Sequence, residues 1–260
     1  MKKLLFVTLA MLTAALAGAA EKAKPINALM ITGGGSHDYT AQRKTLEEGL
    51  KARLNIDLTI LQEGTEREHM HSAYNNPDWA KGYDVVIHNE CFGTVKEVPF
   101  VERIAAPHKA GVPAVILHAS VHAYRYAETD VWRDILGQKS MRHEARQDMK
   151  ITLLDSKHPV MHGFPTEVMD PQDENYMIEK VWPGVTPLAK ATGMTTKNEN
   201  VVVWTHAEGK VRAFVTTLGH LDATMQQPWY LDMVARGVLW SIGKLQDDGK
   251  PAPGYGRSLK

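Results

Sequence analysis

Short apolar runs alternate with helix-like segments through the first half of this chain, and this rhythm constrains the fold more than any other feature. Residues 40–53 carry leucines at helical spacing, and residues 97–110 form a second helical segment that Gly111 ends. The runs with the length and composition of buried strands are 28–32, 56–61, 83–88 and 112–118. Strands that alternate with helices are typical of a parallel sheet. The sequence therefore predicts an α/β fold, with a mostly parallel sheet and helices on both faces.

The pattern changes after residue 125. Residues 201–204 and 211–217 are strand-like and flank a hairpin turn at 207–210, and residues 149–154 form one further strand-like run. Residues 155–200 are rich in proline, glycine, aspartate and threonine, which predicts a segment made mainly of loops. The last regular element is expected at 228–242, where apolar side chains share one helical face behind Pro228.

The amino-terminal segment has the features of an export signal. Lys2 and Lys3 precede a short uncharged apolar run, and small residues follow at 17–19. The predicted organisation is a signal peptide at 1–19, a linker at 20–26, one domain at 27–244 and a flexible tail at 245–260. The mature protein is therefore expected to be periplasmic or secreted. No other run is long enough to span a bilayer, so no membrane attachment is expected after cleavage.

Charge and cysteine content exclude several classes of protein. Lys plus Arg and Asp plus Glu each number 30, which gives no electrostatic reason to bind nucleic acid or an anionic membrane. Cys91 is the only cysteine, so the chain cannot form an internal disulfide. Whether the chain forms a homo-oligomer is left open by the sequence.

Four of the predicted strands end at or near a histidine. These residues are His37, His88, His118 and His220. Ligands of open α/β sheets bind outside the carboxyl ends of the strands, so these histidines are expected to meet in one cleft. Imidazole is the commonest metal ligand and titrates near neutral pH. Five other histidines are expected at the surface: His69, His71, His108, His162 and His206.

Other motifs allow two interpretations each. His118 and His122 would share one metal ion if a helix began after the strand, or only His118 would face the cleft. The glycine-rich loop before His37 is either a ligand-binding loop or a simple turn. Glu174 is either a functional carboxylate over the cleft or part of a solvated acidic turn. Cys91 is either a nucleophile or, as favoured here, a partly buried small hydrophobe.

The ordered set of motifs resembles the ThuA-like, trehalose-utilisation family. The matching pieces are His37-Asp38 after the first strand, His118 after a Gly-x-Pro strand, Trp132 to Gly137 followed by His143, His158-Pro159, Asp173-Glu174 with Tyr176, Val203-Trp204, Gly219-His220 and the helix that ends at Trp240. The resemblance implies a flavodoxin-like fold like that of class I glutamine amidotransferases, with His118 near the place of their nucleophilic cysteine. It also implies a role in sugar catabolism, around oxidised disaccharides such as 3-keto-glycosides.

These observations lead to one main hypothesis. His37, His118 and His220 would hold a divalent metal ion, expected to be zinc, and leave one coordination position open. The catalytic residues would be Glu174, His122 or His143, which would move a proton beside the sugar carbonyl in an elimination, hydrolysis or isomerisation. The expected substrate-binding residues are Asp38, Tyr39, Tyr176, Trp204 and Asp222.

Two alternatives belong to other classes. The same cleft could bind carbohydrate without chemistry, as in a periplasmic binding or accessory protein, and sugar would then bind to metal-free protein. A weaker alternative is a hydrolase that depends on Cys91, which iodoacetamide would inactivate.

Overall fold

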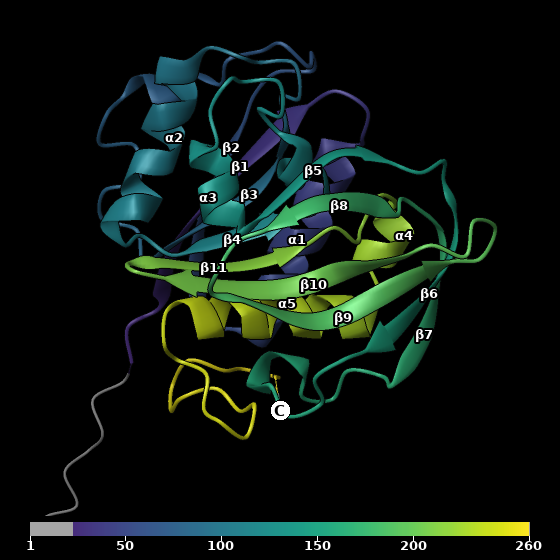
Figure 1. Ribbon diagram of the computed structural model, residues 1–260. Helices are drawn as coiled ribbons and strands as arrows, with labels where there is room; N and C mark the ends of the chain where they lie inside the picture. The colour runs from purple at the N-terminus through teal and green to yellow at the C-terminus, as the bar shows by residue number, and fades with distance from the viewer. Residues whose placement is uncertain (1–22, 260) are drawn as a thin grey trace, which may run out of the picture.

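The computed structural model describes residues 23–259, and the predicted signal peptide at 1–19 lies outside them. Five parallel strands form half of a nine-stranded sheet in the order β2-β1-β3-β4-β11 (Figure 1). They are β1 (Ile26–Gly34), β2 (Ile56–Gln62), β3 (Val85–Cys91), β4 (Ala114–Leu117) and β11 (Val211–Thr216). This strand order is that of the flavodoxin-like fold, which confirms the predicted α/β class.

The other half of the sheet is antiparallel and continues from β11. Its strands, in spatial order, are β10 (Glu199–Glu208), β9 (Val185–Gly193), β6 (Gln147–Leu153) and β7 (Glu167–Asp173). The strands β5 (Gln138–His143) and β8 (Tyr176–Val181) pair separately as a small sheet. The prediction that 155–200 consists mainly of loops was therefore wrong. Exposed polar and proline positions interrupt the apolar pattern of β7, which hides the strand from a sequence search.

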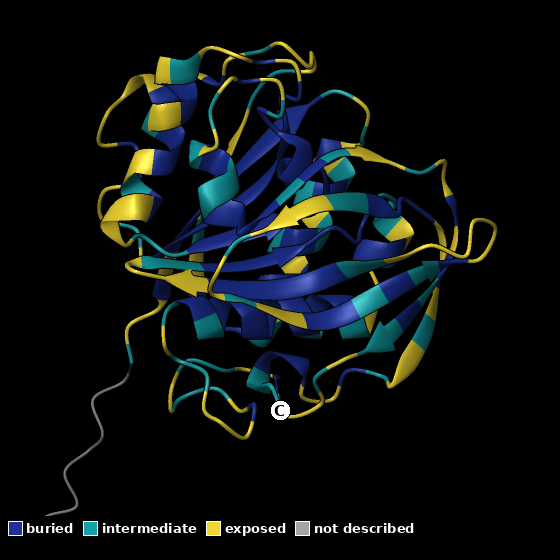
Figure 2. Cartoon of the chain, in the orientation of Figure 1, coloured by how far each residue is buried: buried dark blue, intermediate teal, exposed yellow. Residues whose placement is uncertain are grey.

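Two pairs of helices cover the two faces of the parallel half. Leucines of α1 (Tyr39–Arg53) and α5 (Pro228–Ser241) pack with one set of strand side chains, whereas α2 (Val98–Ala110) and α3 (Val131–Leu136) pack with the other set. Figure 2 shows the strands between these layers as almost wholly buried. The short elements are η1 (Ser72–Asn75), η2 (His118–His122), η3 (Pro159–Met161) and α4 (Asp222–Met225).

The carboxyl-terminal segment is packed against the body of the protein. Leu259 is buried, Tyr255 packs on the core beside α5, and Gly256 bridges to Leu54 at the end of α1. A flexible tail was expected at 245–260, but residues 245–259 are packed against the domain. The reason is that Tyr255 and Leu259, two apolar side chains in an otherwise polar segment, contact the hydrophobic core. Among the described residues, no helix combines the length and apolarity needed to cross a membrane.

Candidate metal and carbohydrate site

Three histidines from distant parts of the sequence meet at the carboxyl ends of the parallel strands. His37 follows β1, His118 follows β4 and His220 follows β11. Their ring centroids lie 4.8 to 5.4 Å apart, and one nitrogen of each ring lies within 4.8 Å of the other two. The parallel topology brings these strand ends to one edge, as the sequence predicted for these three residues.

The backbone around the histidines is tightly constrained. Gly33 has φ +135°, and a Cβ there would lie 2.0 Å from the Glu63 carbonyl oxygen, so only glycine fits at the end of β1. His118 adopts φ +42°, a left-handed conformation that a non-glycine residue rarely takes. Its Nδ1 lies 2.6 Å from the Thr217 carbonyl oxygen, to which it donates. This bond fixes the tautomer and leaves the Nε2 lone pair directed at the site.

The facing nitrogens have no hydrogen-bond partner within the described chain. His37 Nδ1, His118 Nε2 and His220 Nδ1 are all buried, and none forms a well-aligned hydrogen bond. Burial, followed by the charges of His118 and His220, lowers the pKa of His37 to about 3, and burial lowers the pKa of His118 to about 4. Near neutral pH His37 and His118 are therefore uncharged and offer lone pairs, which is the state a metal ion requires. The residues present fit a divalent cation such as zinc.

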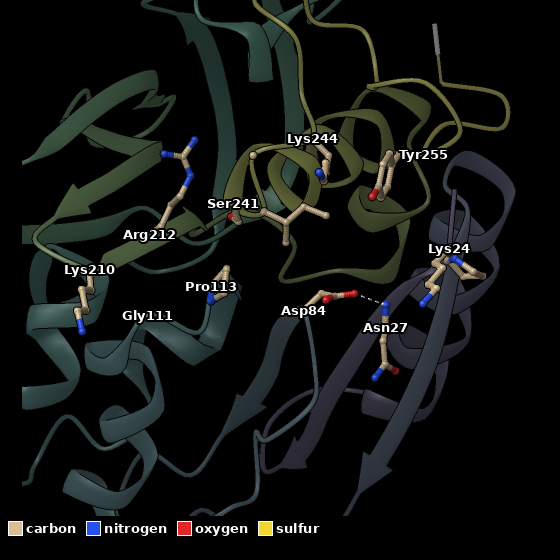
Figure 3. A pocket seen from close by; sticks show the side chains of 13 residues that line it. Lys24, Asn27, Asp84, Gly111, Pro113, Lys210, Arg212, Ser241, Lys244 and Tyr255 are labelled. Carbon is tan, nitrogen blue, oxygen red and sulfur yellow. Dashed lines mark hydrogen bonds between the residues drawn. The ribbon is translucent and has the colours of Figure 1, made fainter. Parts of the chain in front are cut away.

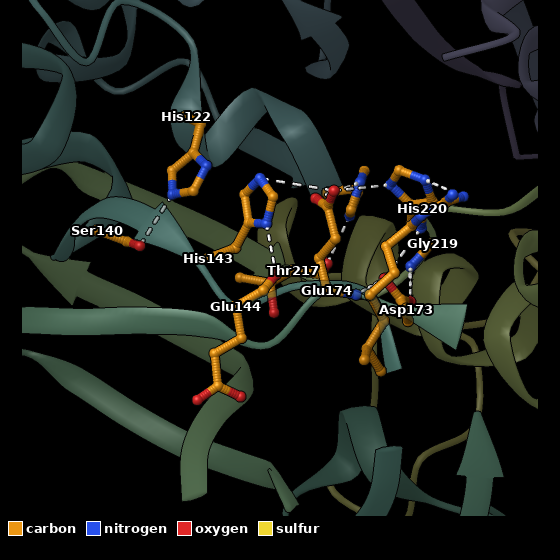
Figure 4. A network of polar contacts seen from close by, with 12 residues as sticks. His122, Ser140, His143, Glu144, Asp173, Glu174, Thr217, Gly219 and His220 are labelled. Atoms are coloured by element: carbon orange, nitrogen blue, oxygen red, sulfur yellow. Dashed lines mark hydrogen bonds and ion pairs between the residues drawn. The ribbon is translucent and has the colours of Figure 1, made fainter. Parts of the chain in front are cut away.

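Glu174 contacts this cluster from the loop between β7 and β8. Its carboxylate oxygens lie 3.2 Å from His220 Nδ1, 3.5 Å from His143 Nε2 and 3.7 Å from His118 Nε2 (Figure 4). Burial alone would raise the pKa of Glu174, but the close contact with His220 and the charges of the nearby histidines lower it to about 2. Glu174 is an ionised carboxylate at the centre of the site.

A buried pair of aspartates holds Glu174 and His220 in place. Asp173 accepts hydrogen bonds from the backbone N–H groups of Glu174 (2.7 Å), Gly219 (2.8 Å) and His220 (3.3 Å). Burial and the Asp173 charge raise the pKa of Asp170 to about 8, so the pair shares one proton at neutral pH. The role of Asp170 and Asp173 in holding Glu174 was not predicted from the sequence. Its only signal there is the spacing of the two aspartates, three residues apart and just before Glu174.

His143 and His122 flank the buried Tyr176. The His122 ring stacks on Tyr176 with centroids 3.9 Å apart, and its Nε2 bonds to Ser140 Oγ at 2.9 Å. His122 does not join the three-histidine group, because η2 is a 3₁₀ helix and a spacing of four does not place side chains on one side of it. His143 is the more exposed of the two, and its Nδ1 lies 2.8 Å from the Glu144 carbonyl oxygen.

The predicted substrate-binding residues are distributed unevenly. Tyr39 lies beside His37, with ring centroids 5.6 Å apart. Asp38 caps α1 by accepting from the Ala41 N–H at 3.0 Å, and Asp222 begins α4. The prediction for Trp204 was wrong: its side chain is wholly buried in the core, and its indole N–H donates to the Leu136 carbonyl oxygen at 2.7 Å.

His88 does not reach the site either. It is an interior residue of β3, which continues to Cys91, and it is buried beneath α2 and α3. There its Nδ1 lies 3.0 Å from Glu90 and its Nε2 lies 3.0 Å from His108. The surface positions expected for His71, His108 and His206 were also wrong, since all three rings are buried and hydrogen-bonded.

Cys91 lies near the site but is not set up as a nucleophile. Burial raises the pKa of its thiol to about 11, so it stays protonated near neutral pH. This agrees with the interpretation of Cys91 as a small buried hydrophobe and argues against a cysteine hydrolase.

A hollow of about 780 Å³ lies at the opposite, amino-terminal edge of the parallel strands. Figure 3 shows basic side chains around it, among them Lys24, Lys210, Arg212 and Lys244. It contains none of the histidines described above, so the chemistry-bearing groups and this hollow are separate features.

An α/β protein with a histidine and glutamate centre at its strand ends is the class that fold and site define. Residues 27–241 match the family model described as ThuA, trehalose utilisation, and the chain belongs to this family. No curated protein matches the sequence.

Two solved structures of ThuA-like proteins show the same fold, and one further structure is a more distant match. A ThuA-like protein from Parabacteroides merdae is 20% identical, with a TM-score of 0.68 over 90% of this chain and 97% of that one. A ThuA-like protein from Bacteroides uniformis is 16% identical, with a TM-score of 0.60 over 87% and 96%. A glutamine amidotransferase from Thermotoga maritima is 13% identical, with a TM-score of 0.42 over 83% and 96%.

Proposed function

We propose that this protein is an exported, metal-assisted enzyme that acts on keto-sugars such as 3-keto-glycosides. The observation that carries the proposal is the convergence of His37, His118 and His220, with one nitrogen of each ring within 4.8 Å of the other two, beside one ionised carboxylate, Glu174. Membership of a family named for trehalose utilisation supports a carbohydrate substrate. A protein that only binds sugar would not need three clustered histidines beside an ionised glutamate, so this arrangement favours an enzyme.

The three histidines would hold the cation, and Glu174 would balance its charge. The cation would supply a Lewis acid that polarises the sugar carbonyl, which makes the neighbouring C–H acidic. Thr217 orients His118 for this task through its carbonyl oxygen, and Asp173 orients His220 through the backbone N–H. Both contacts lie behind the ligating side chains and fix their direction.

His143 is the residue best placed to move the proton. Its Nδ1–H is engaged by the Glu144 carbonyl oxygen, so Nε2 carries the lone pair, and that atom lies 3.5 Å from Glu174. In an elimination, Nε2 takes the proton from the carbon beside the carbonyl. The electrons of that C–H bond form a C=C bond, and the bond to the leaving oxygen breaks. His143 then gives the proton to the leaving oxygen, while Glu174 stabilises the imidazolium.

The first test is the metal content of the purified mature protein, measured by ICP-MS. We expect close to one equivalent of zinc or another divalent ion in the wild type, and a loss of most of it in the His118→Ala/His220→Ala double variant. His162→Ala is the matched control, because His162 is exposed and lies against Gly249 of the carboxyl-terminal segment rather than in the site. It should retain the ion.

Turnover of 3-keto-glycosides is the second part of the test. His143→Ala should lower kcat by about 100-fold or more while metal content is retained, because it removes a general base but no ligand. If metal-free protein binds sugar tightly and no variant shows turnover, the protein is a carbohydrate-binding protein instead. If no divalent ion binds even after it is added back, the metal-assisted mechanism is wrong.

A further inference from the structure

Beside the three-histidine site, two buried hydrogen-bond donors have no acceptor among the described residues. The Tyr39 hydroxyl is buried and has no partner among the described residues, and the buried Nε of Arg125 has none either. Tyr39 also lies against His37 and packs with Cys91. Buried hydrogen-bond donors are normally paired with an acceptor. Unpaired donors at this position therefore indicate a ligand whose oxygen atoms accept their hydrogen bonds.

Arg67 also lies near Cys91. A Cβ placed on Gly93 would lie 3.7 Å from Arg67 Nη2, 3.6 Å from Cys91 Sγ and 3.4 Å from the His122 carbonyl oxygen. Gly93 therefore leaves space between these groups. Arg125 contacts the same His122, since its Nη1 lies 3.2 Å from His122 Nδ1. In agreement with this placement, the positive charges of Arg67 and Arg125 lower the pKa of the Cys91 thiol, against the larger effect of burial.

Neither arginine is neutralised by a carboxylate. Arg125 Nη1 contacts His122 Nδ1 and the Met141 carbonyl oxygen, both at 3.2 Å, and its guanidinium lies over the Tyr126 ring. Within residues 23–259, no acidic side chain forms an ion pair with Arg67 or Arg125. Two unneutralised guanidinium groups and one free hydroxyl are a typical arrangement for binding an oxyanion.

We propose that Tyr39, Arg67 and Arg125 form an anion subsite for a carboxylate or phosphate group on the carbohydrate substrate. The inference rests on the proposed function for the reacting end of the sugar and adds the substrate class, an acidic rather than a neutral carbohydrate. The Tyr39 ring touches the His37 ring, so one small sugar would reach both the histidine centre and the anion subsite.

The test compares binding of three sugars that differ in charge: D-glucuronate, D-glucose 6-phosphate and D-glucose. Isothermal titration calorimetry on the metal-loaded protein should show at least one of the charged sugars binding about tenfold or more tightly than glucose, as expected for a charge-assisted hydrogen bond. Preference for glucuronate or for the phosphate ester distinguishes the two oxyanions.

The Arg67→Met/Arg125→Met variant should lose this preference, and Tyr39→Phe should weaken it by about threefold or more. Arg257→Met is the matched control: this exposed arginine lies in the carboxyl-terminal segment, where its Nη1 donates to the Lys51 carbonyl oxygen at the end of α1. Should the double variant fail to fold, Tyr39→Phe together with Arg67→Met alone makes the same comparison.

Equal affinity for glucose and both charged sugars, or a preference that survives in the double variant, would overturn the anion subsite. Failure of the proposed function gives a different pattern, in which the charge preference persists in the wild type although no divalent ion binds. Metal content measured on every variant separates the two results.

Discussion

At the scale of single residues, the site depends on which nitrogen of each imidazole is free. His118 donates from Nδ1 to Thr217 and His143 donates from Nδ1 to Glu144, so both rings present Nε2 to Glu174. None of these backbone acceptors can be inferred from sequence spacing. The identity of the three clustered histidines could be predicted because each follows a parallel strand, whereas the tautomers that make them useful required the three-dimensional structure.

The Glu174→Gln variant tests the charge at the centre of the site. An amide of the same shape cannot stabilise an imidazolium, so kcat should fall by about 100-fold, while the protein keeps its fold. Activity measurements combined with circular dichroism check both expectations. Glu208→Gln is a suitable control, since Glu208 is exposed on β10 near His206, on the far side of the core from the site. An unchanged kcat in Glu174→Gln would remove this carboxylate from the mechanism.

The Asp170–Asp173 pair predicts a loss of stability on the alkaline side. The pKa of Asp170 is 3.8 in the unfolded chain and is raised to about 8 in the folded protein. Between these pH values the folded protein holds a proton that the unfolded chain has lost, so the free energy of unfolding falls as pH rises towards 8. Between pH 6.5 and 8 the wild type should lose about 2 kcal/mol that Asp170→Asn does not lose. Urea unfolding at both pH values measures this difference. Asp247→Asn, at an exposed position, should behave like the wild type.

At the scale of secondary-structure elements, the parallel strands were predictable and the antiparallel ones largely were not. The strands β1, β3 and β4 are buried on both faces and form continuous apolar runs, whereas β7 and β8 are partly exposed and alternate irregularly. The same physics explains the error with His88. A sequence run that ends in histidine does not show that β3 continues for three more residues, which turns a strand-end position into a core position.

The carboxyl end of β1, at Gly33, provides a prediction at this scale. Gly33→Ala would bring a Cβ to 2.0 Å from the Glu63 carbonyl oxygen in addition to the strain of φ +135°, so we expect a loss of more than about 3 kcal/mol and displacement of the His37 loop. Gly82→Ala separates the two effects, because Gly82 also has a positive φ but no atom within 4 Å of an added Cβ. It should cost only about 1 kcal/mol. If both variants lose a similar free energy of unfolding, the clash between the added Cβ at position 33 and the Glu63 carbonyl oxygen does not determine the loss.

At the scale of the whole molecule, the fold brings uncharged histidines into a buried site of a protein whose formal net charge is zero. The acid sensitivity of the folded state should therefore come from specific buried groups rather than from general charge repulsion. His37 and His118 have folded pKa values of about 3 and about 4, below the ordinary 6.5. Between pH 6.5 and those values the unfolded chain binds protons that the folded chain does not, so stability falls as pH falls through this window.

The size of this acid-dependent loss of stability can be predicted for the metal-free protein. In the presence of a chelator, the free energy of unfolding of the wild type should decrease between pH 6.5 and 4, with His118 contributing on the order of 3 kcal/mol. His118→Asn has no titrating group at this position and should show a shallower decrease by about that amount. His162→Asn, at an exposed position, should follow the wild type. A bound divalent ion would add stability above pH 6.5 and lose it in acid, because protons compete for the same nitrogens. Identical acid profiles for the wild type and His118→Asn would mean that His118 is accessible to protons in the folded protein, and the buried, uncharged histidine site would have to be abandoned.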